Sequence, residues 1–355
     1  MGFHYENPGL RLTAETVNGA HLVAFAYDDD GLLTQAGAMT LTPHASHGLL
    51  EATTLGVVAT SYAYTPFGEL DADTATVAGA PLYANSYPIR DELGRIRRKV
   101  ETLQGTTTTW DYAYDPAGRL DTVHRGGALV ADHAYDANGN RLCTNETGGA
   151  CPSPAVYDAQ DRLVSDGTGR TYAYTEAGEL RRVSEGGLHT LYAYDALGSL
   201  RSACLGSSDP DTCTGGTLVA YEVDALGRRI GKRVNGALQK GFLWSDALRV
   251  AAELDASGAV VSRFVYGTRP NVPESMGKGG NTYQILTDHL GSARLVVDVA
   301  SGAVAQRIDY DVWGVPTFVT GPADFQPFGF AGGLYDADTG LVRFGARDYD
   351  ARTGR

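Results

Sequence analysis

The sequence predicts an all-β fold made of repeated antiparallel β-hairpins, and three observations carry this prediction. The chain has 355 residues, of which 45 are Gly and 20 are Tyr but only 3 are Met. Such a composition suits many short strands joined by tight turns. A motif of tyrosine, aspartate and glycine recurs along the chain, at intervals of roughly 20 residues where it is densest. No helical apolar period separates its copies.

The clearest copies of this motif hold Tyr, Asp and Gly at the first, second and fifth positions. They are Tyr114, Asp115 and Gly118, then Tyr135, Asp136 and Gly139, then Tyr194, Asp195 and Gly198. Weaker copies lie at residues 27–32, 64–70, 157–163, 174–180 and 223–229. Self-similarity at a short period is typical of repeat arrays in which each unit buries its apolar face against its neighbours.

Each copy is interpreted as a strand, a turn and a second strand. In residues 171–174 and 191–194 two tyrosines stand two positions apart, so both rings lie on one face of a pleated strand. Aspartate suits the first position of a type I turn, and the glycine three residues later adopts positive φ without strain. Each repeat therefore supplies about one hairpin, and neighbouring hairpins form a continuous sheet.

The chain divides into three parts in this interpretation. Residues 1–267 form the repeat array, residues 268–282 are a Gly/Pro-rich connector, and residues 283–355 form a distinct C-terminal unit. A closed β-propeller is the main alternative architecture, because radial repetition also gives regular sheets. The irregular spacing of the copies counts against it.

The charge balance argues against a nucleic-acid partner. With 29 basic and 42 acidic residues the formal net charge is -13, and no basic stripe is dense enough to follow a phosphate backbone. No apolar run approaches the roughly 20 residues that span a bilayer, and the first residues lack the basic and apolar regions of a signal peptide. We therefore expect neither a nucleic-acid partner nor a membrane span.

The four cysteines form two local pairs. Cys143 and Cys151 enclose one short polar segment, and Cys204 and Cys213 enclose another. A disulfide within each pair would close its own loop and would require an oxidising compartment. Reduced thiols remain an alternative. A zinc site is disfavoured, because the spacing is not CxxC and no histidine lies in either segment.

Candidate catalytic and metal-binding residues have better structural explanations. Asp288 and His289 are adjacent, as in an acid–base pair, but neighbouring strand residues point to opposite faces and no nucleophile motif accompanies them. His44 and His47 have no third ligand nearby. The sequence therefore predicts no enzyme activity, no catalytic residue, no cofactor and no metal. The rows of tyrosines are expected to pack rather than to bind glycans.

Four ordered motifs occupy the C-terminal unit. They hold Asp288, His289, Gly291 and Arg294, then Tyr310, Asp311 and Gly314, then Gly332, Gly333, Tyr335 and Gly340, and finally Arg347, Tyr349 and Asp350. Together they resemble the RHS repeat-associated core, and the repeats before them are similar to the YD repeats of the same family. Val312, Trp313 and Asp348 depart from the usual pattern of that family.

The resemblance implies a spiralling sheet that forms a curved or closed YD-shell capped by the RHS core, as in bacterial RHS proteins, Tc toxin C proteins and teneurins. The implied role is structural: the shell encapsulates or presents a polymorphic C-terminal toxin or effector, normally part of the same polypeptide, in a secreted or cell-surface protein. Delivery-machinery proteins and cell-surface glycans are further expected partners. An extracellular glycan- or protein-binding adhesion module is the alternative function.

Many members of this family cut themselves with paired aspartates that lie downstream of the core. Those motifs would follow Arg355, so the resemblance transfers no cleaving aspartate to any residue of this sequence. A self-cleaving aspartyl autoprotease is therefore an alternative only where that downstream segment is present.

Overall fold

The structure is a computed structural model, and it describes residues 1–6, 9–145, 151 and 153–355. Within these ranges the fold is built of antiparallel strands, and the one helical segment is the short 3-10 helix η1 (Phe330–Gly332). The strands form two large sheets and one small sheet. The predicted all-β fold is confirmed.

The first sheet has 14 strands in sequence order, so each strand pairs with the next one along the chain. They are β1 (Gly2–Tyr5), β2 (Leu12–Val17), β3 (Ala20–Tyr27), β4 (Leu33–Ala36), β5 (Met39–Pro43), β6 (Leu50–Leu55), β7 (Val58–Tyr64), β8 (Leu70–Val77), β9 (Ala80–Arg90), β10 (Ile96–Leu103), β11 (Thr106–Tyr114), β12 (Leu120–Arg125), β13 (Ala128–Tyr135) and β14 (Arg141–Asn145).

The second sheet has 16 strands, also in sequence order. They are β15 (Val156–Tyr157), β16 (Leu163–Ser165), β17 (Thr171–Tyr174), β18 (Leu180–Glu185), β19 (Leu188–Tyr194), β20 (Leu200–Ser207), β21 (Thr217–Val223), β22 (Arg229–Val234), β23 (Ala237–Trp244), β24 (Val250–Asp255), β25 (Val260–Val265), β26 (Ser275–Lys278), β27 (Asn281–Thr287), β28 (Ala293–Asp298), β29 (Val304–Tyr310) and β30 (Pro316–Thr320).

The small sheet consists of β31 (Leu334–Tyr335), β32 (Leu341–Phe344) and β33 (Arg347–Asp350). The long, uninterrupted series of hairpins differs from a propeller, in which short separate sheets repeat around an axis. The propeller alternative was therefore wrong.

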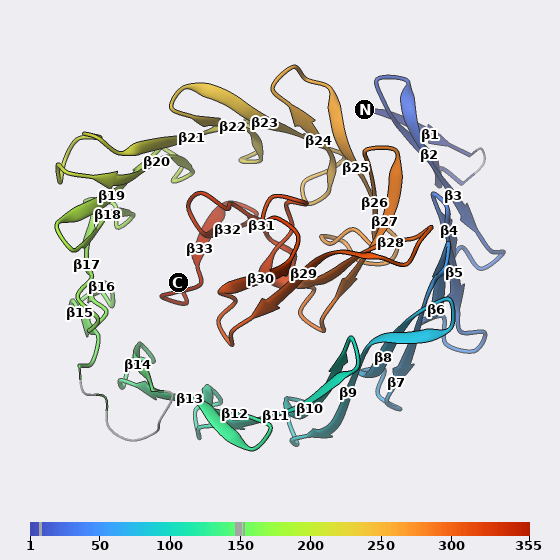
Figure 1. The fold of residues 1–355 in the computed structure, drawn as a ribbon, viewed down its shortest axis with the longest axis horizontal. Helices are drawn as coiled ribbons and strands as arrows, with labels where there is room; N and C mark the ends of the chain where they lie inside the picture. Colours follow the sequence, from blue (N-terminus) through green and yellow to red (C-terminus); the bar gives the residue numbers. More distant parts are fainter. Residues whose placement is uncertain (7–8, 146–150, 152) are drawn as a thin grey trace.

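The two large sheets curve around a common centre and make a ring (Figure 1). β1–β14 follow one side and β15–β25 the other, and the chain then turns inward so that β28–β33 lie in the middle. We call β1–β25 the wall and residues 283–355 the central unit. The two sheets do not join into one closed sheet, because among the described residues no strand pairing links β14 to β15 or β1 to β30.

The segment 268–282, expected as a connector, contains a strand of the sheet. β26 pairs with β25 and β27, and Met276 stands opposite Phe264 and Tyr283. Gly279 and Gly280 have φ of 58° and 83° and form the two-residue turn between β26 and β27. The glycines therefore make a hairpin where the sequence suggested a linker.

The repeat turns have the geometry expected from their sequence. The Gly118 N–H donates to the Asp115 carbonyl (2.9 Å), and the Asp115 carboxylate accepts the Arg119 N–H (2.9 Å). Gly118, Gly139 and Gly198 have φ of 85°, 88° and 77°. Only glycine adopts this region without strain, so the glycine of the motif is explained by the turn.

Side chains join one repeat to the next in a pattern that we call the tyrosine ladder. Tyr114 donates its hydroxyl to the Ile96 carbonyl (2.9 Å) on the preceding strand, and Tyr135 donates to the Leu120 carbonyl (2.8 Å). The guanidinium of Arg119, in the turn before, lies 4.5 Å from the centre of the Tyr135 ring. These tyrosines therefore pack within the wall, with their hydroxyls already bonded.

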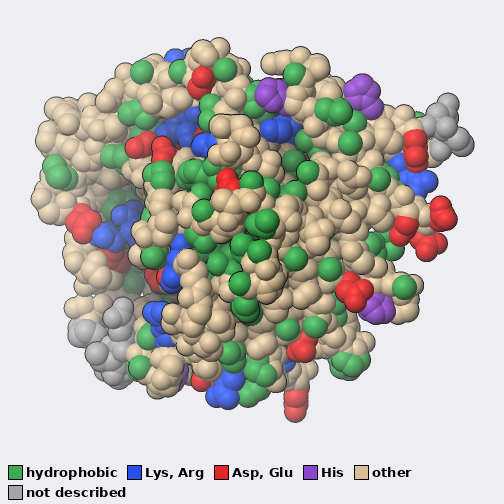
Figure 2. Space-filling view, turned by 45° about the vertical axis from the view of Figure 1, so that its right-hand side comes forward, with side chains coloured by type: hydrophobic (Ala, Val, Ile, Leu, Met, Phe, Trp, Pro, Cys, Tyr) green, Lys and Arg blue, Asp and Glu red, His purple; other side chains and the backbone are tan. Residues whose placement is uncertain are grey.

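Apolar clusters fill the space between the wall and the central unit. One contains Val58 of the wall and Leu295 of β28, both fully buried. Another contains Phe264 and Phe328, whose rings meet edge to face at 5.0 Å. A third reaches from the wall to Leu341 of β32. Figure 2 shows hydrophobic side chains gathered over the middle of one face. The three clusters pack the centre of the ring.

Candidate functional site between the wall and the central unit

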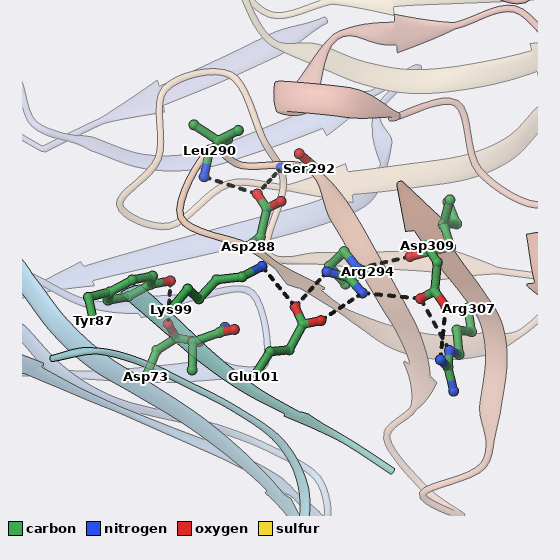
Figure 3. Close-up of polar contacts among 12 residues, drawn as sticks. Asp73, Tyr87, Lys99, Glu101, Asp288, Leu290, Ser292, Arg294, Arg307 and Asp309 are labelled. Carbon is green, nitrogen blue, oxygen red and sulfur yellow. Dashed lines mark hydrogen bonds and ion pairs between the residues drawn. The ribbon is translucent and has the colours of Figure 1, made fainter. Parts of the chain in front are cut away.

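A group of charged side chains lies in the interior, where the turn after β27 meets β8–β10 of the wall (Figure 3). Asp288 begins this turn, and its carboxylate accepts the N–H groups of Leu290 (3.0 Å) and Ser292 (2.8 Å). Gly291 has φ of 89°. Asp288 is therefore bound as a turn residue, in the same way as Asp115 in the wall.

His289 stands at the tip of the same turn. Its ring centre is 5.4 Å from that of Tyr87. Burial lowers the pKa of the imidazole, Lys99 and Arg90 add to this effect, and Asp288 opposes it. The ring is therefore neutral at pH 7. Among the described residues that line the cavity beside it there is no serine or cysteine that such a base would activate.

Arg294, on β28, is the centre of the charged network. It donates to Glu101 on β10 (2.6 Å), to Asp309 on β29 (3.1 Å) and to the Ile308 carbonyl (2.9 Å). The side chains of Arg294 and Glu101 are only 8% and 7% exposed. Because a guanidinium presents several donors in one plane, Arg294 binds both carboxylates at once and ties the central unit to the wall.

Lys99 and Glu101 stand two positions apart on β10 and both point inward. Lys99 Nζ lies 3.3 Å from Glu101 Oε1. Burial acts to raise the pKa of Glu101, but the charges of Lys99 and Arg294 outweigh burial, so the pKa lies below its usual value. Glu101 is therefore ionised at neutral pH, and its two cationic partners compensate its desolvation.

Asp73, on β8, is a buried carboxylate with neutral hydrogen-bond partners. It accepts from Asn85 Nδ2 (3.0 Å) and from the Tyr87 hydroxyl (3.3 Å). Burial raises the pKa of Asp73 to about 6, although both hydrogen bonds and the charge of Arg269 act against this rise. Asp73 therefore binds a proton in mildly acidic solution, in contrast to Glu101.

A cavity of about 510 Å³ lies between β10–β12 and the central unit. Its lining includes the rings of Trp110, Tyr112 and Phe330. The size suits a small molecule rather than a folded domain. The charged groups on one side of the cavity, Glu101 and Arg294, already bind each other. The Glu101–Arg294 pair therefore fixes the central unit against the wall at this side of the cavity.

The second motif of the central unit forms another turn of the same kind. The Asp311 carboxylate accepts the N–H groups of Trp313 (2.9 Å) and Val315 (2.8 Å). Gly314 has φ of 94°, and an added Cβ would lie 2.3 Å from the Phe330 ring. This glycine is required twice, by its backbone conformation and by the close contact.

The remaining motif residues serve packing and turns. Gly332 and Gly340 have φ of 74° and 72°, and an added Cβ at Gly333 would meet Val342 at 2.4 Å. Each of the others has a partner: the Tyr310 ring lies 6.1 Å from Phe330, Tyr335 lies 5.8 Å from Phe318, Tyr349 donates to the Trp313 carbonyl (2.8 Å), Asp350 pairs with Arg352 (3.1 Å), and Arg347 stands opposite Phe344 on β32.

Buried ion pairs join distant segments, and none of the sequence motifs indicates which residues pair. In four of them every side chain is at most 10% exposed, and the partners lie more than 100 positions apart. They are Glu101–Arg294 (2.6 Å), Lys232–Asp336 (2.6 Å) and Arg229–Asp348 (2.8 Å), which link the wall to the central unit, and Glu15–Arg263 (2.9 Å), which links the two sheets. One signal of a buried ion pair was present in the sequence. Lys99 and Glu101 stand on the same face of β10 as the apolar Leu103, and all three residues are buried.

The two cysteine pairs are bonded in the structure. Cys143 joins Cys151 with a Cα–Cα distance of 6.0 Å, and Cys204 joins Cys213 at 5.7 Å. Across the part of the chain that is described, no group of three or more His, Cys, Asp or Glu is placed to hold a metal ion. In the same part, no helix has the length and apolar character needed to cross a membrane.

Residues 7–355 match the family model described as Teneurin YD-shell. This chain belongs to the teneurin YD-shell family. Teneurin-3 of Danio rerio is 29% identical to it over 271 residues, which are 75% of this chain and 10% of the relative. Teneurin-1 of Gallus gallus is 31% identical over 257 residues, 71% of this chain and 9% of the relative. The recognition of YD repeats and an RHS core in the sequence is thereby confirmed.

A bacterial relative and a solved structure extend the comparison. The tRNA3(Ser)-specific nuclease WapA of Bacillus spizizenii is 28% identical over 238 residues, 65% of this chain and 10% of the relative. The Photorhabdus luminescens Tc holotoxin pore has a TM-score of 0.44 and 15% identity, covering 89% of this chain and 20% of that chain. The YD-shell chain described here spans about a tenth of the length of its curated relatives.

Proposed function

We propose that this YD-shell chain is a structural module without turnover, which encapsulates or presents a C-terminal toxin or effector by forming a rigid, plugged section of shell. One observation carries the proposal: the middle of the ring is occupied by the central unit, and buried ion pairs hold it against the wall. A filled ring of this kind closes a shell and gives an attached segment a fixed base.

The chemistry of the interior supports a role without catalysis. Asp288 accepts two backbone N–H groups of its own turn, and Arg294 is bound to two carboxylates. Since a cavity of about 510 Å³ is too small for a folded domain, a protein cargo would lie against this section rather than inside it. The alternative of self-cleavage depends on aspartates downstream of Arg355 and stays a hypothesis for longer polypeptides only.

The effector, normally part of the same polypeptide, is the partner that this proposal favours. Delivery-machinery proteins or cell-surface glycans would be secondary partners. A glycan-binding adhesion module is less supported, because the ladder tyrosines Tyr114 and Tyr135 use their hydroxyls within the wall. A secreted or cell-surface location fits the two disulfides, which persist in oxidising compartments.

Limited proteolysis of a longer polypeptide that carries a downstream segment tests the proposal. We expect the downstream segment to be cleaved more slowly when it is joined to the shell than when it is produced alone. The Glu101→Ala variant, which loosens the central unit, should remove that protection. Equal cleavage of the segment in all three samples would contradict a holding function. Mass spectrometry of the same polypeptide decides whether it cuts itself.

A further inference from the structure

The arginine of a repeat turn has a fixed place in the wall. Arg119 pairs with Asp115 in its own turn (2.7 Å) and lies over the ring of the next motif tyrosine, Tyr135 (4.5 Å). Arg95 lies over Tyr114 in the same way (4.3 Å). The ladder therefore places a guanidinium from one turn against the aromatic ring of the following repeat.

Two clear copies of the repeat lack this arginine: the turn at Asp195 has Ser199 in its place, and the turn at Asp136 stands where the two large sheets meet. The turn that begins at Asp136 has Asn140 at the position that Arg119 holds one repeat earlier. The next motif tyrosine is Tyr157, on the first strand of the second sheet. Its ring therefore receives no arginine from the turn that precedes it.

We call the joint between β14 and β15 the seam. Among the described residues no strand ladder crosses it. The Ala155 N–H donates to the Leu142 carbonyl (2.7 Å), and the Tyr157 hydroxyl donates to the Arg141 carbonyl (2.6 Å). Because the described residues make few backbone bonds across the seam, their side-chain contacts contribute a larger share of its stability than such contacts do elsewhere in the wall.

Arg355 supplies the guanidinium that Tyr157 does not receive from the turn at Asn140. Its guanidinium lies 4.7 Å from the centre of the Tyr157 ring, donates to the Asp161 carbonyl (2.8 Å) and donates to Asn140 Oδ1 (2.5 Å). Asn140 Nδ2 in turn donates to Asp161 Oδ1 (2.7 Å). The amide of Asn140 thus uses its oxygen for the arginine and its nitrogen for the carboxylate across the seam.

The segment that carries Arg355 is fixed to the same part of the wall. The guanidinium of Arg141 lies 4.1 Å from the centre of the Trp313 ring and donates to the Arg352 carbonyl (3.1 Å). Tyr349 donates its hydroxyl to the Trp313 carbonyl (2.8 Å). Arg355 is therefore presented to the seam by contacts that hold the residues before it, which reduces the entropy lost when its side chain is ordered.

We propose that Tyr157, Asn140 and Asp161 form a guanidinium-binding site across the seam, and that Arg355 of the central unit occupies it and holds the two sheets together. The site offers an aromatic face and two oxygen acceptors, which is the combination that a planar guanidinium satisfies. A lysine ammonium would use the ring and fewer of the acceptors. The proposal concerns the assembly of the ring and is independent of any effector.

Hydrogen exchange of the full chain tests this site. In the Arg355→Gln variant we expect amide exchange in β15 and β16 to be about tenfold faster, because local opening depends on the contacts at that place. Exchange in β7 and β8 should not change. Arg355→Lys should fall between wild type and Arg355→Gln. Adding Asn140→Arg to Arg355→Gln should slow exchange again, since the turn then supplies its own arginine to Tyr157.

A matched control removes an arginine elsewhere in the ladder. Arg119→Gln should speed exchange in β13, which carries Tyr135, and leave β15 and β16 unchanged. The proposal would be overturned by unchanged exchange in β15 and β16 of Arg355→Gln. It would also be overturned by an equal increase in β7 and β8, which would indicate general destabilisation, or by failure of Asn140→Arg to restore slow exchange.

Discussion

The wall and the central unit are stabilised by contacts of very different reach along the sequence. In the wall, Tyr135 bonds to Leu120 and stacks with Arg119, so one repeat contacts the next. The central unit depends on Arg294 and Glu101, which are 193 positions apart. Local contacts form as soon as two repeats adjoin, whereas a remote pair forms only when the ring is assembled. The geometry of each hairpin in the wall is thus local information, and the position of the centre is not.

The largest expected effect comes from breaking a remote pair. Glu101→Ala leaves Lys99 and Arg294 buried without their carboxylate, so we expect a loss of about 3–5 kcal/mol in the free energy of unfolding, measured by urea denaturation. The control is Asp111→Ala on the next strand, which removes the exposed pair with Arg98 and should cause a much smaller loss. Similar losses in both variants would show that the two regions do not differ as described.

The second test varies the pH, because the pKa values of the two buried carboxylates in the candidate site are shifted in opposite directions. The pKa of Asp73 is raised and that of Glu101 is lowered. The folded state raises the pKa of Asp73 from 3.8 to about 6, so it binds the proton more tightly than the unfolded chain does. The contribution of this group to stability is therefore present below pH 3.8 and is lost as the pH rises to about 6, an effect on the order of 3 kcal/mol.

Asp73→Asn should remove that pH dependence. The amide keeps an oxygen for Asn85 and places its nitrogen toward the Tyr87 hydroxyl, so the variant should be more stable than wild type at pH 7. Urea midpoints measured from pH 4 to pH 7 check this. A wild-type slope that survives in Asp73→Asn would assign the titration to another group.

The third test changes the local geometry of one turn. Gly198 has φ of 77° and no close neighbour, so a valine there suffers mainly from the backbone conformation. Gly198→Val should lower the free energy of unfolding by about 1–3 kcal/mol and disturb the array around that hairpin. Gly277→Val is the matched control, because Gly277 also has open space around it but ordinary φ. Unchanged thermal melting of Gly198→Val would contradict the turn assignment.

The smallest expected effect comes from one contact of the ladder. Tyr135→Phe removes the hydroxyl that donates to the Leu120 carbonyl and keeps the ring under Arg119, so a loss of about 1 kcal/mol is expected from urea denaturation. Tyr5→Phe, on the exposed end strand, should have no measurable effect. A loss as large as that of Glu101→Ala would mean that the ladder, too, acts over long range.

The fold was predictable from the sequence where the physics is local. Asp115 and Gly118 predict a turn because their side-chain and backbone preferences act within five residues. The structure confirms a β-hairpin array. Gly279 and Gly280 contributed to the prediction of a connector at residues 268–282, because a two-glycine hairpin turn and a flexible linker have the same composition. Nothing near Glu101 in the sequence indicates Arg294 as its partner. That pairing follows from the curvature of the ring, which is the sum of many small strand twists.

Only the C-terminal half of the candidate site stands in a sequence motif, and the wall residues Lys99 and Glu101 do not. Asp288, Gly291 and Arg294 stand in a motif and were expected as scaffold. The structure assigns the first two to a turn and the third to an ion pair with the wall. Trp313 and Asp348, which depart from the family pattern, contact Arg141 and Arg229 of the wall. The two residues that differ from the family pattern are thus residues through which the central unit contacts the wall.

The buried pairs also set how many hairpins fit around the centre. Glu101 and Lys232 both lie on the wall, and their partners Arg294 and Asp336 belong to one packed unit. A hairpin inserted between Glu101 and Lys232 would lengthen the arc between them by two strands, and both pairs would not form together. A hairpin added before Glu15 would leave them intact. Insertions and deletions should therefore be tolerated outside this arc and selected against within it.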